Sequence, residues 1–179
     1  MTSSDDDLAV AAACGDAAAF SVLIDRHYDR LFGLCFRLLG TRDQAEDLTQ
    51  DICAALPSKL RGFRGDARFS TWLYRVAVNG AHDWRRRAGT RAKAAEGWGD
   101  WEVARRAEAD EARAAQDWLT TAMGSLPPDL RDTLALILDE EMTHAEAAAV
   151  LDVSEGTVSW RMSEVRKRLK AMSMEEARP

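Results

Sequence analysis

The sequence is poor in the two residues that most often interrupt helices. It has 4 prolines and 11 glycines in 179 residues, while alanine, leucine and arginine are frequent. Because these three residues favour helices, we expect an all-α fold. A hydrophobic fraction of 46% can build a core, which excludes a wholly disordered chain.

Long apolar runs and cysteine pairs are also missing. No run approaches the roughly 18 apolar residues that a membrane-spanning helix needs. Residues 2–7 are polar and acidic and do not form the core of a secretory signal. Cys14, Cys35 and Cys53 form no C-x-x-C pair and lie among apolar residues. We therefore expect buried thiols in a cytoplasmic protein without membrane insertion; a redox role for them does not follow from the sequence.

The motifs of common enzymes are absent. The sequence lacks the glycine-rich loops of P-loop and dinucleotide-binding proteins and the G-x-S-x-G of many hydrolases. His27, His82 and His144 are scattered and have no metal-ligand spacing. We expect neither an enzyme nor a cofactor or metal site.

The formal net charge of -6 argues at first against a nucleic-acid partner, but the charge is unevenly distributed. Residues 1–95 carry 14 Lys and Arg against 12 Asp and Glu, and the acidic excess lies beyond them. Residues 85–93 contain five cations and no anion, and residues 161–170 contain five cations and one anion. Two basic patches on an acidic body indicate a protein that a larger partner holds on DNA.

Apolar residues three and four positions apart predict three helices between residues 7 and 56. Asp16 is the expected cap of the second helix, and Gly40 its end. Thr41 and Gln44 form a capping-box pattern that opens the third helix.

Further along, the third helix is expected to end at about Leu56, and Pro57 and Gly62 to bracket a short turn of helix. Ser70 or Thr71 is expected to cap a fourth helix that reaches Arg87. Residues 88–107 then lose the helical periodicity and gain glycines and acids, which is typical of a linker. The last third has a short helix with a Thr143–Glu146 capping box, a tight turn, and a longer basic helix that starts at Ser154. This order predicts a helix-turn-helix.

The stretch from Phe63 to Arg87 combines aromatic rings with a block of arginines. Aromatic faces stack unpaired bases, and arginines bind phosphates. Asn79 and Asp66 offer hydrogen-bonding groups to a base edge, whereas Trp72 and Trp84 could instead serve the core. The candidate contacts of this single-strand site are Phe63, Arg64, Asp66, Phe69, Trp72, Asn79, Asp83, Arg85, Arg86 and Arg87.

Two other helix faces are candidate binding surfaces. In the last helix, an apolar seam from Val158 to Met172 turns inward and leaves a polar face with one large aromatic. Its candidate contacts to duplex DNA are Thr157, Ser159, Trp160, Arg161, Ser163, Glu164 and Lys167. The outer face of the third helix is acidic and is formed by Asp43, Glu46, Asp47, Gln50 and Asp51. It is either a protein-docking face or simply a solvated one.

Together these motifs resemble the extracytoplasmic-function group of bacterial sigma factors, in the family's order and over nearly the whole chain. Residues 45–51 are similar to the region-two helix that docks on the polymerase, and residues 63–87 to the part that opens and reads the minus-ten element. Residues 126–131 and 155–169 are similar to the start and the recognition helix of region four, which reads the minus-thirty-five element.

The resemblance implies two small helical domains, region 2 over residues 1–94 and region 4 over 113–179, joined by a flexible acidic linker over 95–112. It implies binding to core RNA polymerase, through the clamp of the beta-prime subunit and the flap of the beta subunit, and to promoter DNA. It also implies a repressing anti-sigma factor. The linker would thread into the polymerase or would be disordered.

Two departures keep alternatives open. Members of the family usually have a basic residue in place of Ser159, and often another in place of Glu164. An acid facing phosphates is unfavourable, although Glu can accept a hydrogen bond from cytosine. The alternatives are a sigma mimic that binds an anti-sigma factor and a stand-alone helix-turn-helix repressor. The repressor would not need the acidic face, and the mimic would not need Phe63, Asn79 or the arginine block.

Overall fold

All regular structure in the described part of the chain is helical, as expected. The computed structural model describes residues 3–95, 111–138 and 142–176, which contain eight helices and no strand. The first four are α1 (Asp5–Ala13), α2 (Ala17–Leu39), α3 (Arg42–Leu60) and α4 (Phe69–Ala95). The other four are α5 (Glu111–Ser125), α6 (Pro128–Ile137), α7 (His144–Leu151) and α8 (Glu155–Glu176).

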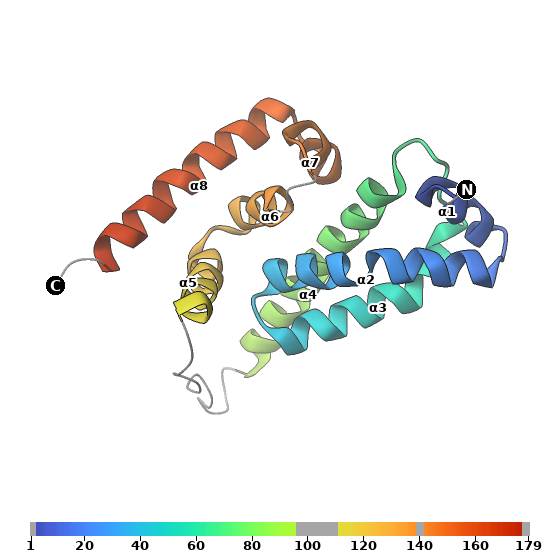
Figure 1. Ribbon diagram of the computed structural model, residues 1–179. Helices are drawn as coiled ribbons and strands as arrows, with labels where there is room; N and C mark the ends of the chain where they lie inside the picture. Colours follow the sequence, from blue (N-terminus) through green and yellow to red (C-terminus); the bar gives the residue numbers. More distant parts are fainter. Residues whose placement is uncertain (1–2, 96–110, 139–141, 177–179) are drawn as a thin grey trace.

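Helix α2 is the centre of the N-terminal group, where it packs against α1, α3 and α4 (Figure 1). Its buried stripe contains Leu23, Leu31, Leu34 and Leu38, which recur at helical spacing. In the C-terminal group, α6 and α7 pack against the apolar seam of α8, in which Val158 and Val165 are buried.

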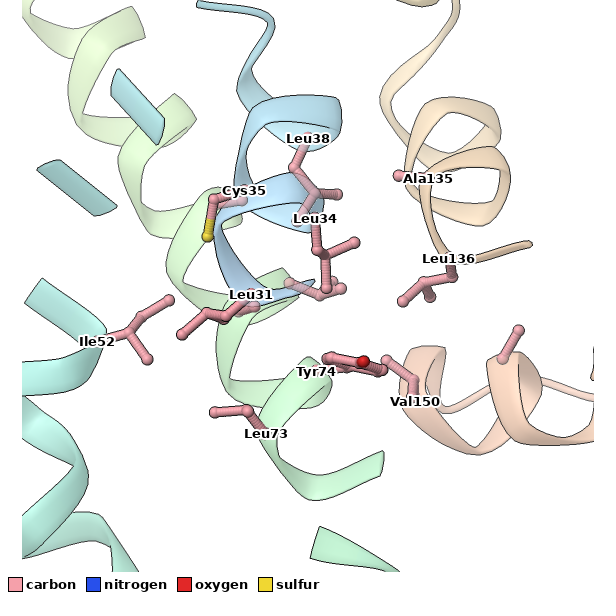
Figure 2. Packing of buried hydrophobic residues seen from close by; sticks show 14 of the residues in the cluster. Leu31, Leu34, Cys35, Leu38, Ile52, Leu73, Tyr74, Ala135, Leu136 and Val150 are labelled. Atoms are coloured by element: carbon pink, nitrogen blue, oxygen red, sulfur yellow. The ribbon is translucent and has the colours of Figure 1, made fainter. Parts of the chain in front are cut away.

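The two groups also touch each other. Helix α4 packs against α7, and α2 packs against α6. Figure 2 shows Tyr74 of α4 beside Val150 of α7, with Leu136 of α6 nearby. Arg37 Nε donates to the carbonyl oxygen of Ala135 over 2.9 Å. A shared apolar seam with polar contacts therefore joins the two halves.

Several predicted helix ends are confirmed. Asp16 accepts from the backbone N–H groups of Ala18 and Ala19, and Gly40 ends α2 in the left-handed conformation with φ of 86°. Thr143 and Glu146 form the predicted capping box of α7. The hydroxyl of Ser154 accepts from the backbone N–H of Thr157 and so caps α8. These ends depend on local chemistry, which a sequence carries completely.

Other ends were predicted wrongly. The side chain of Thr41 makes no capping hydrogen bond, and α3 runs through Pro57 to Leu60. Since proline removes only one backbone donor, packing of the buried Leu56 and Leu60 can carry the helix past it. Helix α4 starts at Phe69, and its first N–H is capped by Asp6 of α1. It also continues beyond Arg87 to Ala95.

The predictions for the thiols are only partly confirmed. Cys35 is buried, and that burial raises the pKa of its thiol to about 11. Cys53 is half-buried, and Cys14 is exposed, so the expectation that all three are buried is wrong. Cys14 lies at the C-terminal end of the short helix α1, as its C-cap residue.

Much of the predicted linker, residues 95–112, lies outside the described residues. In the part of the chain that the structure describes, no helix is both long enough and apolar enough to cross a membrane.

Candidate nucleic-acid interface

A cluster of aromatic rings closes the loop between α3 and α4. The Phe63 ring meets Trp72 edge to face at 5.5 Å and Phe69 at 6.1 Å between centroids. Phe69 in turn meets the ring of His27 at 5.2 Å. Edge-to-face pairs of this kind fix the ring orientations. The loop that follows Phe63 therefore rests on a rigid aromatic base.

Burial divides these rings into two classes. Phe69 is only 1% exposed, so its predicted contact with DNA is corrected: its ring supports the loop from beneath. Phe63 and Trp72 are half-buried and keep part of their surface open. Only these two predicted aromatics can offer a ring to a base in this arrangement.

The polar residues of the loop point to solvent. Arg64, Asp66 and Arg68 are exposed, and Gly65 has φ of 73°, a left-handed conformation that favours glycine. Arg68 Nη1 lies 3.3 Å from Glu146 Oε1 of α7. A short exposed turn therefore places a cation and an acid next to the open aromatic rings.

Asn79 and Asp83 lie one turn apart on the exposed surface of α4. Asp83 pairs with Arg86 at 3.1 Å, and Arg87 is exposed beside them. Asn79 is one position from Gly80, whose missing side chain lets α4 approach Leu48 of α3 closely. The amide of Asn79 is thus held on a backbone that packs tightly.

Arg85 faces another protein helix in this structure. Its guanidinium donates two hydrogen bonds to the Asp132 carboxylate of α6, over 2.9 and 2.8 Å. His82 Nε2 lies 2.7 Å from the same carboxylate. The expected contact of Arg85 with the DNA backbone is not made in this arrangement, because two of its N–H groups are directed to Asp132.

The outer face of α8 is largely as predicted. Trp160 is 63% exposed, and Ser163 and Lys167 are exposed with it. Thr157 bonds to Ser154 over 2.8 Å, and Ser159 lies 3.1 Å from His144 Nδ1 of α7. The Thr157 hydroxyl is thus oriented by the turn before α8, and the Ser159 hydroxyl by the start of α7.

Two predicted residues of α8 are placed differently. Arg161 turns back to α6, where it lies 3.4 Å from Thr133 Oγ1 and 3.6 Å from Asp129. It is therefore corrected from a DNA contact to a support of the fold. Glu164 is half-buried and accepts from Arg168 Nε over 3.0 Å, so that its charge is offset by a neighbour one turn away.

The acidic face of α3 is open to solvent. Asp43, Asp47, Gln50 and Asp51 are exposed, while Glu46 is half-buried and pairs with Arg42 at 2.7 Å. The opposite face buries Ala45, Leu48 and Ile52 against the rest of the N-terminal group. A fixed helix thus presents several carboxylates together on one exposed face, an arrangement of the kind that can steer association with a basic surface.

The sequence reasoning missed Arg68, Arg75 and Asp132 as functional candidates. Arg75 donates to the carbonyl oxygen of Ala149 in α7. Arg68, Arg75 and His82 are seven positions apart, a spacing of about two turns that places them on one face. That period could have identified the cations from the sequence, but nothing local marks Asp132 as their partner.

Among the described residues, no group of three His, Cys, Asp or Glu side chains is placed to hold a metal ion.

Family models match both halves of the chain. The model of Sigma-70 region 2 matches residues 23–91, and that of Sigma-70, region 4 matches residues 116–169. The ECF RNA polymerase sigma factor SigM of Mycobacterium tuberculosis is 34% identical over 168 residues, which cover 93% of this chain and 83% of SigM. The RNA polymerase sigma-H factor of Pseudomonas aeruginosa is 29% identical over 166 residues, covering 87% and 86%.

Solved structures have the same fold. A chain of the structure of CnrH in complex with the cytosolic domain of CnrY aligns with a TM-score of 0.71 at 27% identity, over 97% of this chain and 99% of that chain. The sigma factor RpoE in complex with the anti-sigma factor NepR, from Bartonella quintana, aligns with a TM-score of 0.73 at 24% identity, over 89% and 98%.

Proposed function

Since the chain belongs to the sigma-70 family, within its extracytoplasmic-function group, we propose that it directs core RNA polymerase to specific promoters and starts the opening of the DNA strands. One observation carries the proposal: region 2 and region 4 of the family follow each other on one chain, over residues 23–91 and 116–169. Each region has an exposed surface with the chemistry that its role needs.

In this proposal, α3 is the helix that docks on the polymerase. The exposed carboxylates of Asp47 and Asp51, with Asp43, Glu46 and Gln50, face basic residues of the clamp. Rim charges of this kind speed and orient association more than they tighten the complex. The family implies a second contact, between region 4 and the flap of the beta subunit.

Strand opening belongs to the loop after α3. A base turned out of the duplex would lie against the open edges of Phe63 and Trp72, with Asp66 and the amide of Asn79 available to its polar edge. Turning a base out costs a few kcal/mol, which stacking and hydrogen bonds to the correct base offset. Opening would therefore be favourable at the right sequence only. Arg64, Asp83, Arg86 and Arg87 would contact the strand around it.

Reading of the upstream duplex belongs to α8. A helix of this kind enters the major groove with its N-terminal residues against base edges. Thr157, Ser159, Trp160, Ser163 and Lys167 occupy its open face. The ring of Trp160 suits an apolar contact with a thymine methyl group, and Lys167 suits a phosphate. The pairing of Glu164 with Arg168 reduces the repulsion that an isolated acid would cause.

The proposed domain boundaries follow the regions of the family. We assign residues 1–94 to region 2, residues 95–112 to the linker and residues 113–179 to region 4. The protein acts in the cytoplasm and has no catalysis of its own, because the polymerase supplies the chemistry. An anti-sigma factor controls it; RpoE, a protein of the same fold, was solved in complex with the anti-sigma factor NepR.

Particular residues of this chain would have no role in either rival function. A sigma mimic would not need the exposed amide of Asn79 or the open rings beside it, and a stand-alone repressor would not need the acidic face of α3.

The function is tested by adding the purified chain to core polymerase that lacks any sigma factor, with a pooled library of promoter sequences. We expect transcripts that start at defined positions of a subset of the library. Initiation no different from that of the core enzyme alone would contradict the proposal.

A further inference from the structure

His144 is the first residue of α7, and its side chain reaches the outer face of α8. The imidazole Nδ1 lies 3.1 Å from the hydroxyl oxygen of Ser159, near the start of α8. Figure 1 shows α7 next to this end of α8, and the two helices pack against each other. Ser159 is exposed on the face that the proposed function assigns to the upstream duplex. A candidate reading residue is therefore held by a side chain from outside the reading helix.

The backbone that carries the imidazole is fixed by the capping box on either side of it. The N–H of Thr143 donates to the Glu146 carboxylate over 2.8 Å, and the N–H of Glu146 donates to the Thr143 hydroxyl over 3.2 Å. These bonds from Thr143 hold the pKa of Glu146 below its ordinary value, so the carboxylate stays charged and the box stays closed at neutral pH. The ring of His144 can therefore keep the Ser159 hydroxyl in one orientation.

Ser163 shows what an unheld hydroxyl on the same face looks like. It lies one helical turn after Ser159 and is also exposed. Among the described residues, none forms a hydrogen bond with the Ser163 hydroxyl. A free hydroxyl rotates, donates and accepts, so a serine of this kind can serve any base. A hydroxyl that has given its proton to a partner presents only lone pairs to a base.

The place of α7 in a helix-turn-helix decides which way the hydrogen bond between His144 and Ser159 runs on DNA. The first helix of this motif crosses the DNA backbone, and helix N-termini contact phosphates. Phosphate oxygens only accept, so a neutral imidazole at this end of α7 keeps its proton on Nε2. Its Nδ1 then accepts the proton of the Ser159 hydroxyl. The Ser159 oxygen is left as an acceptor.

We propose that His144 is a positioning residue for upstream recognition, which fixes Ser159 as a hydrogen-bond acceptor. Ser159 then selects an amino group, that of cytosine or adenine, over the carbonyl oxygen of guanine or thymine. Ser163, without such a partner, makes no selection of this kind. The inference rests on the proposed function, because it needs α8 in the major groove of the upstream duplex.

The test uses the full chain bound to core polymerase, with a promoter library that is random in the upstream element. The templates of the transcripts are sequenced. At one position of the element, read along one strand, the wild type should favour A and C over G and T by about fivefold, the size of one net hydrogen bond. Ser159→Ala and His144→Ala should each remove this preference and leave the other positions unchanged. An unchanged preference in His144→Ala would overturn the proposal.

Ser163 supplies the matched control, through two double-mutant cycles. His144→Ala combined with Ser159→Ala should lose no more selectivity than either single variant, because each removes the same interaction. His144→Ala combined with Ser163→Ala should give losses that add, because the two side chains do not touch. Additive losses in the first cycle would mean that His144 and Ser159 act independently, and the positioning role would be wrong.

His144→Asn covers the case in which loss of the ring disturbs α7. Asparagine keeps a polar atom on Cγ, where Nδ1 is bonded in histidine, so this variant should retain the preference that His144→Ala loses. If both variants lose it equally and keep the rest of the upstream element, the hydrogen bond at Nδ1 is not its cause and the proposal is overturned. Failure of the proposed function has a different outcome, since the wild type would then select no upstream element at all.

Discussion

The backbone N–H of Phe69 donates to Asp6 Oδ1 over 2.7 Å, although the two residues are 63 positions apart. Asp6 thus acts as the N-terminal cap of α4 from another helix. The side-chain ring of Phe69 packs against the rings of Phe63 and Trp72. Helix α1 therefore fixes the start of the helix that carries the proposed base-capturing site.

Asp6→Ala should lower the free energy of unfolding by about 1 kcal/mol, the usual contribution of an N-cap side chain. Denaturant unfolding followed by circular dichroism measures the change. The matched control is Asp25→Ala, at an exposed position of α2, which should stay within about 0.5 kcal/mol of the wild type. Equal stability of both variants would mean that the cap contributes nothing to the start of α4.

The three thiols should differ in reactivity. Thiolate is the reactive form, and burial raises the pKa of Cys35 to about 11 and also raises the pKa of Cys53. At mildly alkaline pH an aromatic disulfide reagent should label the exposed Cys14 first and Cys35 last. Cys14→Ser should remove the fast phase alone. Rapid labelling of Cys35 in the folded protein would contradict its placement in the core.

The acidic face of α3 should control association with polymerase. Replacement of both Asp47 and Asp51 by Lys should weaken binding of core polymerase several-fold, mainly through slower association, and the loss should shrink as salt increases. Fluorescence-detected binding of labelled chain to core enzyme measures both rates. Asp25→Lys with Asp29→Lys makes the same charge change on α2. If both double variants bind equally well, the acidic face of α3 is only solvated.

Local features of the fold were readable from the sequence. The Asp16 cap, the Gly40 end and the Thr143–Glu146 box each depend on residues within four positions of one another. The start of α4 could not be read in this way, because its cap comes from Asp6. The continuation of α3 through Pro57 likewise depends on packing that no local rule contains.

The candidate site was readable to a similar degree. The exposure of Trp160 follows from the period of α8, and the half-open rings of Phe63 and Trp72 follow from their places in the loop before α4 and in its first turn. The burial of Phe69 and the inward turn of Arg161 depend on helices distant in the sequence. The pairing of Arg85 with Asp132 joins residues 47 positions apart, so the periodicity of α4 alone could not reveal it.

The central claim is that one chain reads two promoter elements with two separate surfaces, and promoter selection tests it most directly. Core polymerase with the wild type, with Asn79→Ala or with Lys167→Glu transcribes a random promoter library, and the templates of the transcripts are sequenced. We predict two enriched elements for the wild type. Asn79→Ala should weaken the preference at the downstream element only, and Lys167→Glu should reduce dependence on the upstream element only. Selection of no common sequence by the wild type, or loss of the same element in both variants, would contradict the account.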